Sequence, residues 1–322
     1  KSTPLETVVA VNMLEEVPLH LRAALALPLP RVKKMRAELS RPAQGTLPWR
    51  KFMRQRPRTV HFPRVTQGTT AFILYTSGTS GRPKGAPLTH GNIVAVLTAG
   101  LQWLENWGAV REKVLGLLPM FHIYGLALNY AMPLTIGAQM VLVPAPKPKL
   151  YQAAITKTRP TVLPGVPTLY HAIIEWALKT KADLSSIHTS ISGASTLPAE
   201  TIERWETATG GRLIEGYGLT ETSPILAGNP LDGTRRPGYI GLPFPNTEIR
   251  IADPDNPART MPDGEPGELL ARGPQVFSGY LGNPEANERA FHDDWFRTGD
   301  MAVMEADGWI KLVARIKEMI IT

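Results

Sequence analysis

The chain has 322 residues, enough for about two domains and a large buried core. Its 43% hydrophobic and 20% charged residues are ordinary for a globular protein, and it contains no cysteine. The lack of cysteine excludes disulfides, thiolate metal sites and a cysteine nucleophile, and it fits a cytosolic protein.

The net charge of +7 comes from the first fifth of the chain, where residues 1–60 hold 12 Lys and Arg against 4 Glu. A solvated basic face, an anionic membrane surface and nucleic acid are three interpretations of this stretch. We expect no nucleic-acid partner, because no aromatic-interleaved or helix-turn-helix pattern accompanies the charge. No signal peptide is visible. We therefore predict a cytoplasmic protein, and peripheral contact with the inner face of the membrane stays open.

Residues 1–66 are rich in Pro and have weak periodicity, which predicts an irregular segment with one helix near residues 19–27. Between residues 71 and 226, predicted strands and helices alternate. The strands are expected at 71–75, 114–118, 139–143, 187–192 and 212–217, and the helices at 93–103, 124–134, 168–179 and 197–209. Repeated β–α units with uncharged strands predict an α/β fold, a parallel sheet with helices on both faces.

An uncharged run lies between Lys113 and Lys147 and is long enough, by hydropathy alone, to cross a membrane. Pro119 and Pro133 interrupt it, so we divide it into a strand, a helix and a second strand. After about Arg235, short β-rich segments at 248–252, 268–272, 301–305 and 309–313 alternate with Gly, Pro and Asp turns. This spacing predicts a small antiparallel β-barrel or sandwich.

The most informative segment is YTSGTSGRPKG, residues 75–85, which follows a predicted strand and precedes a helix that Thr89 is placed to cap. Its glycines let the backbone approach a ligand closely, and its hydroxyls and Lys84 supply donors and positive charge. Such a loop is typical of a polyphosphate cradle. It is not a Walker loop, since Gly85 stands where that pattern requires Ser or Thr.

Three later segments follow this loop: GYGLTETSP (216–224), GELLARGPQVFSGYLGNPE (267–285) and WFRTGD (295–300) with GWIKLVARIKE (308–318). In type, order and distance these motifs resemble those of the adenylate-forming enzymes, which comprise acyl-CoA synthetases, luciferases and peptide-synthetase adenylation domains. The resemblance is close over residues 69–322 and loose over residues 1–66. It implies ATP and Mg²⁺ as cofactors and coenzyme A as co-substrate, with a carboxylate converted to acyl-AMP and then to acyl-CoA.

The resemblance assigns nucleotide binding to Thr76, Ser77, Gly78, Thr79, Ser80, Lys84, Gly193, Ala194, Ser195, Tyr217, Gly218, Thr220, Asp300 and Arg315. Lys84 and the loop would bind the β- and γ-phosphates. Thr220 would donate a hydrogen bond to the α-phosphate, and Tyr217 would lie against the adenine ring. Asp300 would accept hydrogen bonds from both ribose hydroxyls, and Arg315 would support the ribose and the phosphate. The alternatives are a core aromatic for Tyr217 and surface ion pairs for Asp300 and Arg315.

Four residues are expected to act in the chemistry: Lys84, His122, Thr220 and Glu221. Glu221 is the expected Mg²⁺ ligand, because magnesium prefers oxygen atoms shared between carboxylate and phosphate. A helix-capping carboxylate is the alternative for Glu221. His122 would position the reacting groups, since a carboxylic acid needs no base at pH 7; the alternative is a satisfied core histidine.

The chain is expected to be the central part of a longer protein. We divide it into residues 1–66 (a remnant of an N-terminal subdomain), 67–234 (adenylation core), 235–314 (β-barrel subdomain) and 315–322 (a hinge containing Lys317). The C-terminal lid domain of the family, with its adenylation lysine, is then absent. We therefore expect this chain alone to bind nucleotide but to adenylate very poorly.

The segment ITKTRPTVLPGVPTLYHAI, residues 155–173, looks most like long-chain fatty acyl-CoA ligases of bacteria. A medium- or long-chain fatty acid is therefore the expected substrate, with residues 114–143 as candidates to line an apolar tunnel. The alternatives are a fatty acyl-AMP ligase that loads a carrier protein and a non-catalytic nucleotide or lipid sensor. The motifs carry no information about the oligomeric state.

Overall fold

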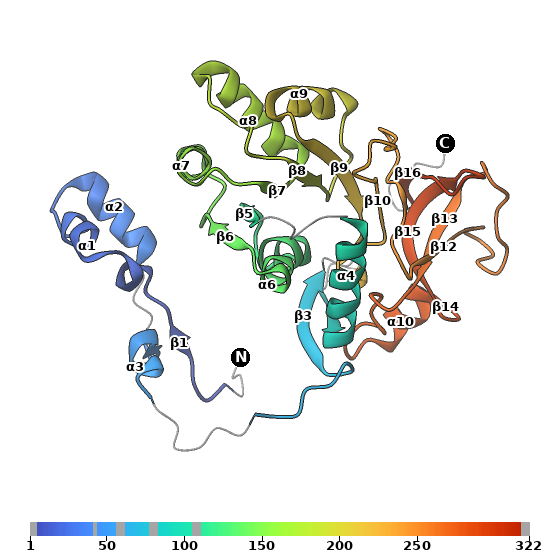
Figure 1. Ribbon diagram of the computed structural model, residues 1–322. Helices are drawn as coiled ribbons and strands as arrows, with labels where there is room; N and C mark the ends of the chain where they lie inside the picture. The colour runs from blue at the N-terminus through green and yellow to red at the C-terminus, as the bar shows by residue number, and fades with distance from the viewer. Residues whose placement is uncertain (1–4, 41–43, 56–61, 77–82, 105–110, 317–322) are drawn as a thin grey trace. The chain divides into compact units, whose positions relative to one another are not determined.

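The computed structural model describes residues 5–40, 44–55, 62–76, 83–104 and 111–316 (Figure 1). The chain forms two compact units, Lys1–Arg64 and Val65–Thr322. The first unit contains η1 (Met13–Glu16), α1 (Leu19–Leu25), α2 (Pro30–Leu39) and α3 (Trp49–Met53), with β1 (Val9–Ala10) parallel to β2 (Leu47–Pro48). Only α1 was expected from the sequence. Pro30 begins α2, where its fixed φ suits a helix start.

The second unit contains the predicted strands and helices in their predicted order, together with a strand at 84–89, a helix at 148–158 and a strand at 162–165 that were not predicted. Its first part contains β3 (Thr70–Thr76), β4 (Lys84–Thr89), α4 (His90–Trp103), β5 (Lys113–Gly116), α5 (Ile123–Gly125), η2 (Leu126–Ala131), α6 (Met132–Ile136), β6 (Gln139–Leu142), α7 (Pro148–Thr158), β7 (Val162–Gly165), α8 (Pro167–Thr180), β8 (Thr189–Ser192), α9 (Ala199–Thr209), β9 (Arg212–Tyr217), η3 (Thr220–Thr222) and β10 (Ala227–Gly228). In the described part of the chain, no helix has the length and apolar character needed to cross a bilayer.

Seven strands form the larger sheet in the order β11-β10-β9-β8-β7-β5-β6, where β11 is Leu242–Pro243. The five strands from β9 to β6 run parallel, whereas β10 and β11 are antiparallel to their neighbours. The sheet is therefore mixed, in contrast to the purely parallel sheet expected from the sequence. The reason is local: the short turn after β9 lets β10 return only as an antiparallel neighbour, because a parallel strand requires a long crossover.

Neighbouring residues of the central strands belong to two different apolar clusters. Leu213 packs with Trp205 of α9 and Tyr170 of α8, while Ile214 packs with Leu128 of η2. Successive side chains of a strand point to opposite faces of a sheet. Figure 1 shows α8 and α9 side by side on one of them. Burial on both faces explains why these strands carry almost no charge.

The last part of the chain forms a second, antiparallel sheet. It contains β12 (Glu248–Ala252), β13 (Gly267–Arg272), β14 (Phe291–His292), β15 (Trp295–Met304) and β16 (Ile310–Arg315), with α10 (Pro284–Ala290) before β14. The order is β12-β13-β15-β14, and β16 also pairs with β15. The antiparallel pairing agrees with the prediction, but the described pairings leave β12 at an edge, so the sheet is open and not a closed barrel.

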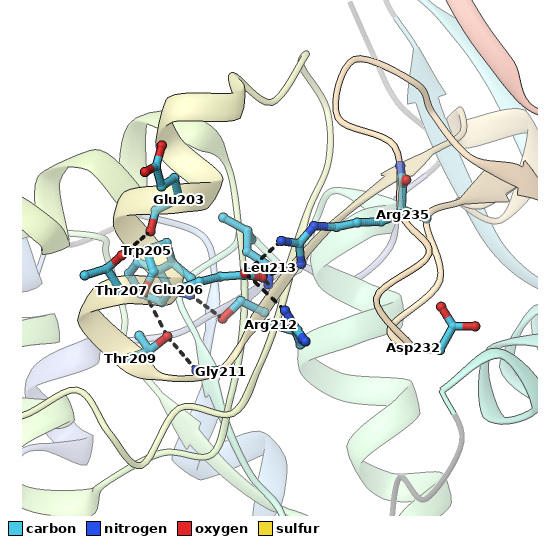
Figure 2. Close-up of polar contacts among 12 residues, drawn as sticks. Glu203, Trp205, Glu206, Thr207, Thr209, Gly211, Arg212, Leu213, Asp232 and Arg235 are labelled. Atoms are coloured by element: carbon cyan, nitrogen blue, oxygen red, sulfur yellow. Dashed lines mark hydrogen bonds and ion pairs between the residues drawn. The ribbon is translucent and has the colours of Figure 1, made fainter.

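An ion-pair cluster around Glu206 of α9 fastens the loop after β10 to the larger sheet (Figure 2). The carboxylate receives two hydrogen bonds from Arg235, at 2.5 and 2.7 Å, and one from the backbone N–H of Leu213, at 2.9 Å. The Arg212 guanidinium lies 3.5 Å away. Because Glu206 is largely buried and bonded on both oxygens, this cluster fixes the end of α9 against the start of β9.

Candidate active site

A cavity of about 1350 Å³ lies in the second unit, bordered by both sheets and by the β3–β4 pair. The residues predicted from sequence that line it are Thr76, Lys84, His122, Gly193, Ala194, Tyr217, Gly218, Thr220, Glu221 and Arg315. Asp300 adjoins the cavity through its contacts with Tyr217 and Arg315, whereas Ser195 is exposed and does not line it. Ser77, Gly78, Thr79, Ser80 and Lys317 lie outside the described residues.

Asp300 is the centre of a polar group on one side of the cavity. Its carboxylate is almost fully buried, and it accepts the Tyr217 hydroxyl at Oδ2 and the Arg315 Nε at Oδ1, each at 2.6 Å. Asp300 and Arg315 are paired residues of β15 and β16, so the sheet register brings them together. Burial, followed by the Asp300 charge, raises the pKa of the Tyr217 phenol well above its ordinary value. Tyr217 therefore stays a neutral donor to this carboxylate.

Glu268 supports the turn that carries Asp300. It is 2% exposed and accepts Nε and Nη2 of Arg297, at 2.8 and 2.5 Å, and the backbone N–H of Gly299, at 3.2 Å. The Thr298 hydroxyl accepts the N–H of Asp300 over 3.1 Å. Glu268, Arg297 and Thr298 belong to the motifs 267–285 and 295–300, but no role was predicted for them from the sequence. The signal was a glutamate directly before the apolar residues Leu269, Leu270 and Ala271 of β13.

Thr220 and Glu221 stand on η3, the short turn that follows β9. The turn starts close to Gly218, where an added Cβ would lie 1.6 Å from the Pro224 carbonyl oxygen. Only glycine fits there. Glu221 is 7% exposed, and its Oε1 accepts the Tyr280 hydroxyl at 2.7 Å. Burial, and then the Glu221 charge, raises the pKa of the Tyr280 phenol, so it too stays a neutral donor.

His122 lines the same cavity and caps α5. Its Nδ1 accepts the backbone N–H of Tyr124 over 3.2 Å. Burial lowers the pKa of the His122 imidazole, so the neutral ring is favoured at pH 7. Because Nδ1 is an acceptor, the proton of the neutral ring sits on Nε2. The side chain can therefore donate one hydrogen bond to a ligand but carries no charge there.

The oxygen ligands around the cavity suit a magnesium ion that is bound together with a polyphosphate. Within the described ranges, no three acidic, histidine or cysteine side chains lie close enough to hold a metal by themselves. Glu221 uses one oxygen to accept Tyr280, and a carboxylate has further lone pairs for a cation. Magnesium is commonly bound through one or two carboxylates together with substrate phosphates. The chemistry of the Glu221 carboxylate is compatible with that role, which stays a prediction.

A second, apolar cavity of about 30 Å³ adjoins the large one. Both are lined by Ile191, Gly216, Pro224 and Ile225, and side chains from α4 and η2 enclose the small one. Its volume is that of about one water molecule. Glu215, which also lines it, is 8% exposed, and burial raises the pKa of its carboxyl group to about 7. This group was missed in the sequence analysis because its strand reads as ordinary sheet.

Comparison with known proteins decides the family. The model of a family described as "AMP-binding enzyme" matches residues 8–281. The chain belongs to the AMP-binding enzyme family. A long-chain-fatty-acid–CoA ligase of Bacillus subtilis (strain 168) is 40% identical over 253 residues, covering 78% of this chain and 45% of that protein. A feruloyl-CoA synthase of Amycolatopsis is 37% identical over 251 residues, covering 78% and 50%.

Solved structures of the family agree with this assignment. The anthranilate CoA ligase AuaEII, in complex with anthranoyl-AMP, superposes with a TM-score of 0.76 at 29% identity, covering 90% of this chain and 58% of that one. The chain spans about half the length of the curated AMP-binding relatives it matches.

Proposed function

We propose that this chain carries the nucleotide site of an AMP-forming fatty acyl-CoA ligase, which activates a medium- or long-chain fatty acid with ATP and Mg²⁺ and passes it to coenzyme A. The convergence on one cavity of Lys84, Glu221, Tyr217 and Arg315, with Asp300 bonded to the last two, supports this proposal. These residues come from three distant parts of the chain: Lys84 from the first, Tyr217 and Glu221 from the second, and Asp300 and Arg315 from the third. A sensor would have less need of the carboxylate suited to a metal.

Each of these residues would contact a different part of the ligand. Arg315 and Asp300 would receive the ribose, with Asp300 accepting hydroxyl donors beside the bonds it already accepts, and Tyr217 would lie near the base. Lys84 and Thr220 would neutralise and orient phosphate oxygens, and Glu221 would hold the magnesium, which screens the charge between carboxylate and ATP. A neutral His122 would donate from Nε2 to the acyl carboxylate. These interactions align two anions, so no protein nucleophile is needed.

We also infer the domain division from the same family assignment. Residues 67–234 would be the adenylation core, a mainly parallel sheet with helices on both faces, and residues 235–314 its β subdomain. Residues 315–322, with Lys317, would form a hinge, and residues 1–66 would belong to an N-terminal subdomain. In this division Lys84, Gly193 and Ala194 of the core would line the cavity together with Arg315, the first residue of the hinge, which suits a site between subdomains.

The apolar cavity indicates where the acyl chain would lie. It shares Ile191 and Ile225 with the nucleotide cavity, and Met132 and Phe244 are also in its lining. Because it holds only about 30 Å³, a long acyl chain requires these side chains to move apart. A flexible methionine suits such a movement. The Bacillus subtilis relative is named for long-chain fatty acids and the Amycolatopsis relative for the aromatic acid ferulate, so the dependence on acyl chain length is the property to test.

The test is a calorimetric titration of the chain with non-hydrolysable acyl-adenylates from acetyl to palmitoyl. Affinity that rises with every added pair of methylenes, each CH₂ contributing up to about 0.8 kcal/mol, supports the fatty-acid assignment. Equal affinity for all lengths, or a preference for an aryl adenylate, refutes it while keeping the nucleotide site. Acyl transfer to a carrier protein and not to coenzyme A would favour the acyl-AMP ligase instead.

Peripheral membrane contact is a second proposal, supported by the first unit. Its helix α1 has no buried residue, and Leu19, Leu21, Leu27 and Leu29 are about half or more exposed beside the basic residues of α2. Apolar and basic side chains together suit an anionic interface. Co-sedimentation with phosphatidylglycerol vesicles at low salt, lost in phosphatidylcholine vesicles, is the expected result. No sedimentation with either would refute it.

A further inference from the structure

Tyr280 contacts both of the charged groups assigned to magnesium and phosphate. Its hydroxyl donates to Glu221 Oε1 over 2.7 Å, and Lys84 Nζ lies 4.6 Å from the centroid of its ring. A cation at this distance over a tyrosine face is attracted by the ring quadrupole. One neutral side chain thus holds a carboxylate by its hydroxyl and an ammonium group by its ring.

The backbone on both sides of Tyr280 is tied to the same two elements. The N–H of Phe277 donates to the carbonyl of Glu221 over 2.8 Å, and the N–H of Leu281 donates to the carbonyl of Gly85 over 2.9 Å. Residues 277–281, which we call the bridging segment, therefore connect η3 with the start of β4 at Lys84. Lys84 and Glu221 are far apart in the sequence, and this segment sets their spacing.

The position of Tyr280 is itself fixed by Asn287 of α10. The Asn287 amide accepts the N–H of Tyr280 over 2.7 Å and donates to its carbonyl over 3.2 Å. Gly279 has φ +132°, and an added Cβ there would lie 2.9 Å from the Asn287 side chain. Phe277 packs edge-on against the Tyr280 ring, with centroids 4.9 Å apart. These contacts hold the ring before any ligand arrives, which is the arrangement expected of a preorganised site.

We propose that Tyr280 is a positioning residue that holds Glu221 and Lys84 at the separation a magnesium–polyphosphate group requires. This inference rests on the proposed function, since that function assigns these two side chains to this ligand. Loss of the hydroxyl would leave a buried carboxylate oxygen without its donor and free Glu221 to reach other rotamers. Loss of the whole ring would in addition release Lys84 from its cation–π contact.

The experiment measures ATP and AMP affinities of the chain by calorimetry, with excess Mg²⁺ and with EDTA. In the variant Y280F, we expect the Mg²⁺-dependent gain in ATP affinity to fall about tenfold, because one hydrogen bond to a charged group is lost. AMP affinity stays within about twofold, since AMP lacks the phosphates near Lys84. Y280L should weaken ATP binding in EDTA as well. Y239F is the matched control, because Tyr239 donates to Glu305, 3.2 Å away, outside the cavity.

A double-mutant cycle with E221Q distinguishes positioning from general structural support. If Tyr280 acts through Glu221, Y280F has no further effect on Mg²⁺ dependence in the E221Q background. The inference is overturned if Y280F keeps the wild-type Mg²⁺ gain, if it weakens AMP as much as ATP, or if its effect persists in full beside E221Q. Failure of the wild-type chain to bind either nucleotide overturns the proposed function, and the inference with it.

Discussion

The buried carboxyl group of Glu215 should make the stability of the chain depend on pH. Its side chain is 8% exposed and receives one long hydrogen bond, 3.4 Å, from the backbone N–H of Leu197. Burial raises the pKa of Glu215 from 4.5 to about 7, because the charged form is poorly solvated. Between about pH 4.5 and pH 7, the native state therefore holds a proton that the unfolded chain has already released.

The sign follows from proton linkage. A carboxyl group with a raised native pKa binds more protons folded than unfolded, so the free energy of unfolding decreases as pH rises from about 4.5 towards 7 and levels off above it. One pKa unit corresponds to about 1.4 kcal/mol, so the loss between pH 5 and pH 8 is about 2 to 3 kcal/mol. Glutamine cannot ionise, so E215Q should be more stable than the wild type at pH 8 and similar to it at pH 5.

The assay is urea unfolding followed by tryptophan fluorescence at pH 5, 6, 7 and 8. Groups that titrate in both proteins cancel when the free energy of the wild type is subtracted from that of E215Q. The control is E203Q, which removes an exposed carboxylate from α9. A difference between E215Q and wild type that stays constant over this range, or that shrinks as pH rises, refutes the assignment of a raised pKa.

Two further substitutions test how the site is supported. E268Q leaves the Arg297 guanidinium without its buried partner, so we expect the free energy of unfolding to fall by about 3 kcal/mol and AMP binding to weaken. Urea titration measures the first effect and calorimetry the second, each beside the E203Q control. Wild-type values for both would contradict the role given to this pair. G218A places a Cβ 1.6 Å from the Pro224 oxygen, so the turn must shift at a cost of about 3 kcal/mol or more. An unchanged urea midpoint for G218A would show that the turn accommodates the added methyl group at little cost in free energy.

The local elements could be predicted well from the sequence. Thr89 begins α4 with a reciprocal capping box, Pro198 precedes α9, and Gly210 ends α9 in the left-handed conformation. Each of these signals acts within one or two turns, so the residues that set it are adjacent in the chain. The motif residues Tyr217, Glu221 and Arg315 could likewise be singled out, because their segments are distinctive in themselves, and all three line one cavity.

The partners of those residues were decided by tertiary structure. The hydrogen bond of Tyr280 to Glu221 joins residues 59 positions apart, and that of Tyr217 to Asp300 joins residues 83 apart. The antiparallel return of β10 and the open edge at β12 also depend on how whole strands pair. Residue type and spacing determine which groups a segment offers, whereas long-range backbone pairing and burial determine which of them meet. The sequence by itself therefore determined the chemical groups of this protein and the elements with strong local signals, and packing decided their contacts and the carboxyl group whose proton affinity is raised.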